Sequence, residues 1–354
     1  MITVAFVRPC SALAACCVLA AGCFNPPPHV EGESEGTGGS GGADEPSSSA
    51  VADGESGDPD VMTGSMSMGE QDDQDAPYVV SLSPETDEAG VLADTPIVIV
   101  FSEPMNREAT EAAWVSATVG AVDFSWNDAG DELTVTPRDP LEYAMVANDG
   151  EPALTYDWTL SAAATDEAGN LLEEAVVTSF TTLRAQSIFA EPVRKLSGSV
   201  VGDQWTELYS PSIGLMVGDD EANQFTRGLL TFPMEFPGNT TTILEAELDA
   251  SHFTAEGTPY DDLGGSIRLH AVEFDIFDIA AADASMRSDV GPLAANAEQL
   301  MVEVDVSDAV RDSFAEALPT TQFRAQFTAE TDGANDIDRQ QLQGISLSVL
   351  VGYP

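Results

Sequence analysis

The chain has 354 residues, of which 61 are Asp or Glu and only 12 are Lys or Arg, so its formal net charge at pH 7 is −49. Such a surface repels the phosphates of DNA and RNA, which excludes a nucleic-acid-binding function. It also opposes electrostatic adhesion to anionic lipid, so attachment to a membrane would require a different anchor.

The N-terminus has the pattern of an export signal. Residues 1–22 contain a single charged side chain, Arg8, followed by a run of apolar and small residues. A basic start, a short apolar core and small residues before the cleavage site are typical of such signals. An uncleaved anchor helix is the alternative, because this segment nearly reaches the about 20 apolar residues that a membrane span needs.

Cys23 follows the small residues at the end of this segment, in the sequence Leu-Ala-Ala-Gly-Cys at 19–23. This sequence resembles the lipobox of bacterial lipoproteins, although Ala20 stands where the family commonly has leucine. The resemblance implies that Cys23 is lipidated, becomes the first mature residue and holds the protein to a membrane. The Leu-Ala-Ala-Cys sequence at 13–16 fits the spacing better but leaves too short an apolar core. All the cysteines lie in this region, namely Cys10, Cys16, Cys17 and Cys23.

Residues 23–76 are predicted to be a disordered linker. They are rich in Gly, Ser, Pro, Asp and Glu, contain no Lys or Arg and show no apolar periodicity. Such a segment cannot bury enough apolar surface to offset the entropy of ordering it. As a flexible coil it would span roughly 40 Å on average, which suits a spacer near a membrane.

From residue 77 to about 184 the chain reads as short strands separated by turn residues. The candidate strands are 78–82, 97–101, 121–126, 132–136, 155–162 and 176–181. The segment 155–160 alternates outward polar residues with inward Tyr156, Trp158 and Leu160, the period of a half-buried strand. Frequent strands without a long helical pattern predict an antiparallel β-sandwich.

Motifs in this region carry a family resemblance. They include Phe-Ser-Glu-Pro-Met at 101–105, Asp-Glu-Ala-Gly-Asn at 166–170 and Thr-Ser-Phe-Thr-Thr at 178–182. Residues 77–184 resemble an SbsA-type bacterial Ig-like domain, which implies an Ig-like β-sandwich acting as a spacer or adhesive module, without chemistry. Gly169 and Asn170 suit a turn with positive φ, and Asp166 is expected to close it.

Residues 186–354 are predicted to form a second β domain. Its candidate strands are 198–208, 228–232, 243–248, 266–274, 300–306, 323–328 and 344–351. A helix is expected at 307–318, with Ser307 as its N-cap and Pro319 ending it. Its apolar stripe has helical spacing and is interpreted as core packing; the stripe is Val306, Val310, Phe314 and Leu318.

The second domain resembles the DNRLRE-type β-sandwich modules in the segments 227–232, 243–248, 267–272 and 302–310, although the motif that names the family is absent. The resemblance implies a jelly-roll-like β-sandwich. Because some of these modules bind carbohydrate, it also implies a polysaccharide or a surface protein as partner. Flat aromatic faces stack on sugar rings. The candidate ligand contacts are therefore Trp205, Tyr209 and Tyr260.

An oxygen-rich loop is the best candidate for metal binding, and no other cofactor is expected. Asp332, Asn335, Asp336 and Asp338 lie close together in sequence and offer the oxygen ligands that Ca²⁺ prefers. The spacing is not that of an EF-hand, and a solvated acidic loop is the alternative interpretation. The acidic runs at 219–221 and 261–262 are similar but poorer candidates.

The residue types for catalysis are sparse, so we do not expect an enzyme. No serine lies in a recognisable activated context, and His270 is expected to be an ordinary strand residue. The favoured function is an exported, lipid-anchored protein at the outer membrane or cell surface, with an Ig-like spacer and a ligand-binding second domain. Two alternatives remain: a purely structural envelope component, or a surface glycan hydrolase that uses paired carboxylates.

Overall fold

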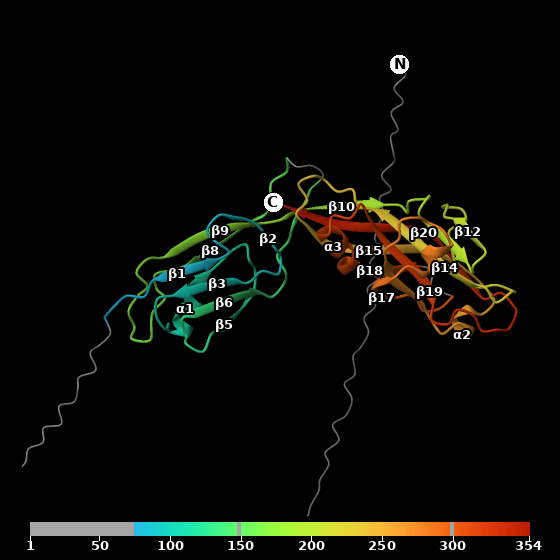
Figure 1. Ribbon diagram of the computed structural model, residues 1–354. Coiled ribbons are helices and arrows are strands. Elements are labelled where there is room, and N and C mark those ends of the chain that lie inside the picture. Colours follow the sequence, from blue (N-terminus) through green and yellow to red (C-terminus); the bar gives the residue numbers. More distant parts are fainter. Residues whose placement is uncertain (1–73, 147–149, 298–300) are drawn as a thin grey trace, which may run out of the picture. The chain divides into compact units, whose positions relative to one another are not determined.

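The computed structural model describes residues 74–146, 150–297 and 301–354 (Figure 1). The predicted signal peptide, Cys23 and nearly all of the predicted linker lie outside the described residues. Strands dominate the part of the chain that is described, so the prediction of an all-β fold is confirmed. The two large hydrophobic clusters have no residue in common. We call the strands around them the first sandwich (β1–β6, β8 and β9) and the second sandwich (β10–β20, with β7 paired to its edge).

The first sandwich contains two four-stranded sheets. One sheet has the order β1 (Val79–Ser83), β3 (Ile97–Phe101), β6 (Glu132–Pro137) and β5 (Val122–Trp126). The other has the order β2 (Glu88–Val91), β9 (Val176–Thr182), β8 (Thr155–Leu160) and β4 (Trp114–Val115). All neighbours are antiparallel except β2 and β9, which are parallel. A short helix, α1 (Arg107–Ala113), precedes β4.

The predicted alternation of β8 is confirmed, because Tyr156, Trp158 and Leu160 are all buried in the core between the sheets. Burial of such large side chains supplies most of the stabilisation of a sandwich. The turn at Asp166 is also confirmed: its carboxylate accepts hydrogen bonds from the backbone N–H and the side-chain amide of Asn170, at 2.8 and 2.7 Å. Gly169 alone supplies the positive φ of that turn, at +95°.

The strands of the second sandwich form one continuously paired path. Its main order is β17 (Met286–Ala294), β16 (Ile267–Val272), β19 (Thr320–Phe327), β14 (Phe225–Pro233), β13 (Leu215–Asp219), β20 (Arg339–Tyr353), β10 (Arg184–Ala190) and β7 (Ala144–Met145). Four strands are attached to this path: β11 (Gly198–Val201), β12 (Trp205–Leu208), β15 (Thr242–Glu256) and β18 (Met301–Asp305). The helical elements are α2 (Pro259–Asp262), η1 (Ile279–Asp283) and α3 (Ser307–Ala315).

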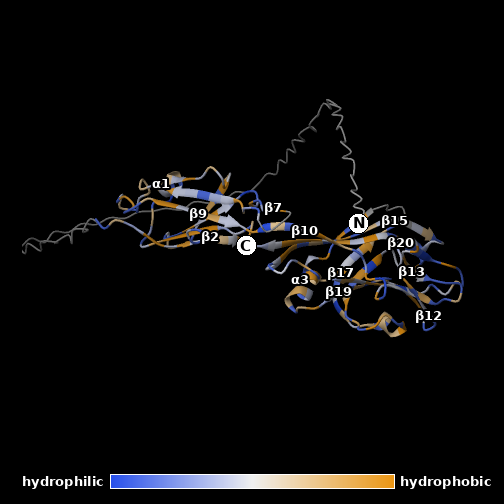
Figure 2. Cartoon of the chain, turned by 90° about the horizontal axis from the view of Figure 1, so that it is seen from above, coloured by the Kyte–Doolittle hydropathy of each residue, from blue (hydrophilic) through white to orange (hydrophobic). Residues whose placement is uncertain are grey.

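One core lies between the strands of the second sandwich. Side chains from β13, β14, β16 and β19 share a single buried cluster with side chains from β15 and β20. The apolar and polar residues that alternate along these strands can be followed in Figure 2. The long strand β20 pairs with β13 near its beginning and with β10 near its end, while β15 pairs along nearly its whole length. This pairing places the loop before β20 against the end of β13.

Two sequence-based predictions in this sandwich need correction. The segment 198–208 is a hairpin, β11 and β12, rather than one strand, because the chain turns at 202–204. The helix α3 begins at Ser307 but its N-cap is Val306, and the Ser307 hydroxyl instead bonds the backbone of Ala246. None of the helices in the described ranges is long and apolar enough to cross a membrane.

The helix α3 also ends earlier than predicted, at Ala315. Ala317 adopts the left-handed conformation with φ of 54°. The N–H groups of Ala317 and Leu318 then donate to the carbonyls of Phe314 and Ser313, which is the pattern of a Schellman motif. The chain therefore leaves the helix before Pro319 is reached.

Candidate functional site

The three aromatic residues predicted as ligand contacts differ in exposure. Trp205 on β12 exposes 45% of its surface, whereas Tyr209 is buried in the core and offers no face to a ligand. Tyr260 packs edge-on against Phe327, with ring centroids 5.2 Å apart. Burial raises the pKa of Tyr260, and its hydroxyl has no hydrogen-bond partner among the described residues. The prediction therefore does not hold for Tyr209, and of the three candidates Trp205 is the one that exposes a large part of its surface.

Only two of the four residues of the predicted metal loop come together. Asp332 and Asp338 lie close together and are joined by Asp262 of α2, with one carboxylate oxygen from each within 4.8 Å of the others. Asn335 turns elsewhere, because its amide oxygen accepts a 2.7 Å hydrogen bond from the side chain of Asn223. Asp336 is exposed and belongs to no such group in the described residues.

A fourth carboxylate adjoins this group. Asp219 ends β13, and Asp338 immediately precedes β20, which pairs with β13. The N–H of Asp219 donates to the Asp338 carbonyl at 2.9 Å, and the Asp338 N–H lies 3.3 Å from Asp219 Oδ1. We call Asp219, Asp262, Asp332 and Asp338 the aspartate cluster. Sequence reasoning names the acidic runs that contain Asp219 and Asp262 only as separate, poorer candidates and does not join them to the loop at 332–338.

Burial governs the electrostatics of the cluster. Asp219 and Asp338 are each only 1% exposed, whereas Asp262 and Asp332 are exposed. Burial raises the pKa of both Asp219 and Asp338, because an ionised carboxylate loses its hydration there. The negative charges of Asp262, Asp336 and Asp219 raise the pKa of Asp338 further. Hydrogen bonds from Thr331 and from the backbone of Asp338 and Asp332 oppose the rise in the pKa of Asp219, and one from the Thr258 backbone opposes it at Asp338. The cluster therefore concentrates negative charge that the folded chain stabilises only in part.

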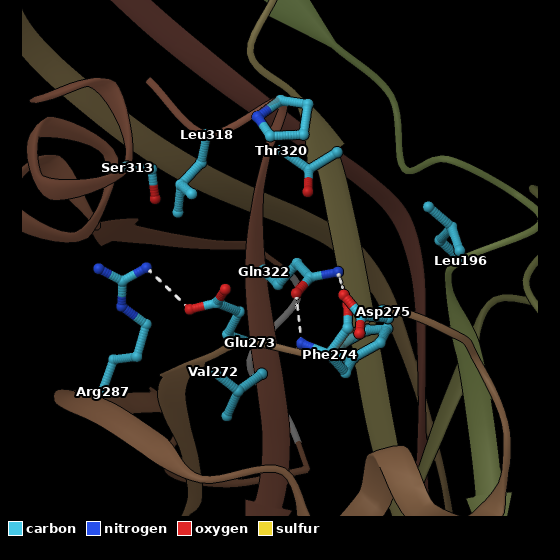
Figure 3. A pocket seen from close by; sticks show the side chains of 11 residues that line it. Leu196, Val272, Glu273, Phe274, Asp275, Arg287, Ser313, Leu318, Thr320 and Gln322 are labelled. Atoms are coloured by element: carbon cyan, nitrogen blue, oxygen red, sulfur yellow. Dashed lines mark hydrogen bonds and ion pairs between the residues drawn. The ribbon is translucent and has the colours of Figure 1, made fainter. Parts of the chain in front are cut away.

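A pocket of the second sandwich lies elsewhere, near the end of α3 (Figure 3). It has a volume of about 370 Å³ and is lined by apolar side chains such as Val272, Phe274 and Leu318, together with polar ones. Arg287 reaches Glu273 at 3.5 Å and is also paired with Glu316. Gln322 holds the backbone of Phe274 through two hydrogen bonds of 2.8 and 3.0 Å. Much of the polar lining is thus engaged in holding the pocket together.

His270 lies in β16, as expected for a strand residue. Its Nε2 is 3.7 Å from Asp289 Oδ1 on the neighbouring strand β17. Burial, followed by the positive charges of Arg324 and Arg268, lowers the pKa of His270, while Asp289 opposes that shift. The imidazole therefore favours its neutral form in the folded protein.

A family model described as a bacterial Ig-like domain matches residues 73–182. The match supports the resemblance predicted for the first sandwich, and its bounds differ by a few residues from the predicted 77–184. It covers about a third of the chain and does not extend to the second sandwich. No curated protein matches the chain.

Solved structures offer distant likenesses. An L,D-transpeptidase from Mycobacterium smegmatis is 14% identical, with a TM-score of 0.22 over 45% of this chain and 77% of that one. The N-terminal part of the bacterial S-layer protein SbsC is also 14% identical, with a TM-score of 0.22 over 44% of this chain and 40% of that one. A native alpha-2-macroglobulin from Escherichia coli is 13% identical, with a TM-score of 0.25 over 76% and 71%. Likenesses at these TM-scores carry no argument about function.

Proposed function

We propose that this protein is a lipid-anchored component of the bacterial cell envelope, in which an Ig-like spacer carries a partner-binding second sandwich. The observation that carries the proposal is the match of residues 73–182 to a bacterial Ig-like domain. The lipobox-like sequence before Cys23 and the acidic composition of residues 23–76 support it, because together they describe a lipid anchor and a spacer.

The anchor is tested by replacing the thiol that would be acylated. Cys23→Ser should move the protein from the membrane fraction to the soluble fraction, whereas the matched variant Cys16→Ser should stay with the membrane. Mass spectrometry of the wild-type N-terminus should find diacylglycerol on Cys23. A Cys23→Ser protein that remains in the membrane with residues 1–22 attached would favour the anchor helix instead.

The partner of the second sandwich is proposed to be a polysaccharide. Trp205 supports this, because its ring is open on the surface and aromatic faces stack on sugars. The soluble chain 24–354 should bind members of a polysaccharide panel, and Trp205→Ala should weaken that binding about tenfold. Binding to no glycan would favour the purely structural alternative, for which the burial of Tyr209 is the supporting observation.

The hydrolase alternative rests on carboxylates that line one pocket. Glu273 and Asp275 both line the pocket of Figure 3, but Glu273 is paired with Arg287. A glycosidase needs one free acid and one free base or nucleophile on opposite sides of the bond that breaks. Release of reducing sugar from a bound polysaccharide, lost in Asp275→Asn, would establish this alternative in place of simple binding.

A further inference from the structure

The aspartate cluster of the second sandwich contains two buried carboxylates with unused oxygens. Asp219 Oδ2 and Asp338 Oδ2 are both buried and have no hydrogen-bond partner among the described residues. The other oxygen of Asp338 accepts a 2.5 Å hydrogen bond from the N–H of Thr258. Buried polar groups are nearly always satisfied, so two orphaned carboxylate oxygens at one place need a compensating group.

Protein cations do not supply that compensation. None of the ion pairs in the described ranges includes a member of the aspartate cluster, and the nearby Arg339 pairs with Glu256 at 2.7 Å. Like charges held close together without water oppose ionisation and destabilise the fold. A bound divalent cation would neutralise the cluster and satisfy the free oxygens at the same time.

The spacing of the oxygens is compatible with calcium, and the number of carboxylate ligands favours calcium over magnesium. Ligand oxygens lie about 2.3–2.6 Å from Ca²⁺, so oxygens on opposite sides of one ion are roughly 4.6–5.2 Å apart. The carboxylate oxygens of Asp262, Asp332 and Asp338 all lie within 4.8 Å of one another, which fits within that limit. Magnesium requires about 2.0–2.1 Å and nearly ideal octahedral geometry and gives up its water reluctantly, so a site made of several protein carboxylates suits calcium better.

Two glycines allow the chain segments around the cluster to lie very close to one another. A Cβ added to Gly257 would lie 2.0 Å from the Ile337 carbonyl and 2.3 Å from Asp338 Oδ1. A Cβ added to Gly218 would lie 2.0 Å from the Asp338 carbonyl. Glycine at both positions lets two chain segments close around Asp338, so this carboxylate is held in place before any ligand arrives.

We propose that Asp262, Asp332 and Asp338 hold a calcium ion in the second sandwich, beside the buried carboxylate of Asp219. The ion ties the helix α2 to the loop before β20, next to the end of β13, and solvent can reach it past the exposed Asp262 and Asp332. Water and backbone oxygens complete its coordination. The site is independent of the proposed lipid anchor and of the proposed polysaccharide partner, so its test does not depend on either.

The test uses the soluble chain 24–354 after treatment with EDTA. Isothermal titration with CaCl₂ should show one saturable site, and calcium should raise the unfolding temperature progressively above that in NaCl of equal ionic strength. Asp332→Asn should weaken calcium binding at least tenfold; its exposed side chain makes it a safe variant for folding. Asp336→Asn, an exposed carboxylate of the same loop, is the matched control and should bind calcium like the wild type.

Three results would overturn the proposal. The first is an unfolding temperature that is the same in CaCl₂ and in NaCl of equal ionic strength. The second is an equal loss of affinity in Asp332→Asn and Asp336→Asn, which would indicate a diffuse acidic surface. The third is magnesium binding as tightly as calcium, which would contradict the argument for calcium over magnesium.

Discussion

The turn at Asp166 allows a quantitative test of the first sandwich. Asp166 is 1% exposed, and its two carboxylate oxygens accept hydrogen bonds from the backbone and side chain of Asn170. The Asp166 N–H donates a hydrogen bond to the Asn170 carbonyl at 3.1 Å, and Asp166 also forms an isolated β-bridge with the buried Met105. The carboxylate thus holds a turn that is docked onto the core.

Asp166→Ala removes both acceptors and should lower the free energy of unfolding by about 2–4 kcal/mol. Hydrogen bonds to a charged group contribute about 1.5–3 kcal/mol each, and water recovers part of the loss at the half-exposed Asn170. For a domain of this size the unfolding temperature should fall on the order of 10–20 °C. Asp166→Asn keeps one acceptor oxygen and should have roughly half of that effect.

Tryptophan fluorescence during urea unfolding measures this change. Of the four tryptophans, three lie in the first sandwich, so a Trp205→Phe background restricts the signal to them. Glu167→Ala, at an exposed neighbouring position, should change stability by less than about 0.5 kcal/mol. If Asp166→Ala were as mild as Glu167→Ala, the carboxylate would not be what holds the turn.

Two more predictions concern the second sandwich. Because burial lowers the pKa of His270, the imidazole is protonated at a higher pH in the unfolded chain than in the folded one. The free energy of unfolding should therefore fall as the pH falls through about 6.5, the usual pKa of histidine. His270→Gln should lose less stability than the wild type between pH 7.5 and 5.5, as measured by urea unfolding, and an equal loss would contradict this. Gly218→Ala should destabilise by about 2 kcal/mol or more, since its φ is +141° and the new Cβ would strike the Asp338 carbonyl. Gly238→Ala, where nothing lies within 4 Å of the new Cβ, should be nearly neutral, and urea unfolding measures both glycine variants.

Local patterns in the sequence predict much of the fold. The alternation at 155–160 predicts both the strand β8 and its buried face, because one side of that strand packs into a core and the other side remains largely outside it. The strand β3 is predicted with its observed bounds, 97–101, because it is a continuous run of β-branched and aromatic residues. The hairpin at 198–208 is missed although Gly202 and Asp203 are turn residues, because the prediction joins the apolar residues on both sides of them into one strand.

Tertiary pairing explains why some strands are missed from the sequence and others are predicted too short. The strands β15 and β20 both extend through polar residues, at 249–256 and 339–343, because each satisfies the backbone groups of the other. Similarly, β13 is a short segment that gains its strand character from pairing with β14 and β20. A window along the sequence contains no information about partners more than a hundred residues away.

The aspartate cluster shows the same limit at the level of a site. Three acidic runs are visible in the sequence, at 219–221, 261–262 and 332–338, and the cluster takes members from all three. Grouping oxygens by their closeness in sequence selects Asn335, which bonds Asn223 instead, and Asp336, which is not among the grouped carboxylates. The pairing of β13 with β20 and the position of α2 determine which carboxylates meet.

A calcium site would compensate for a shortage of covalent cross-links in this protein. All four cysteines lie within the first 23 residues, so no disulfide can join the strands of either sandwich. Such an ion would bind the folded chain and not the unfolded one, so it would stabilise the fold by an amount that grows with the ratio of free calcium to the dissociation constant. The excess of acidic over basic residues also raises the local concentration of cations around the protein. An acidic surface and a buried aspartate pair therefore act in the same direction: the first gathers calcium, and the second retains it.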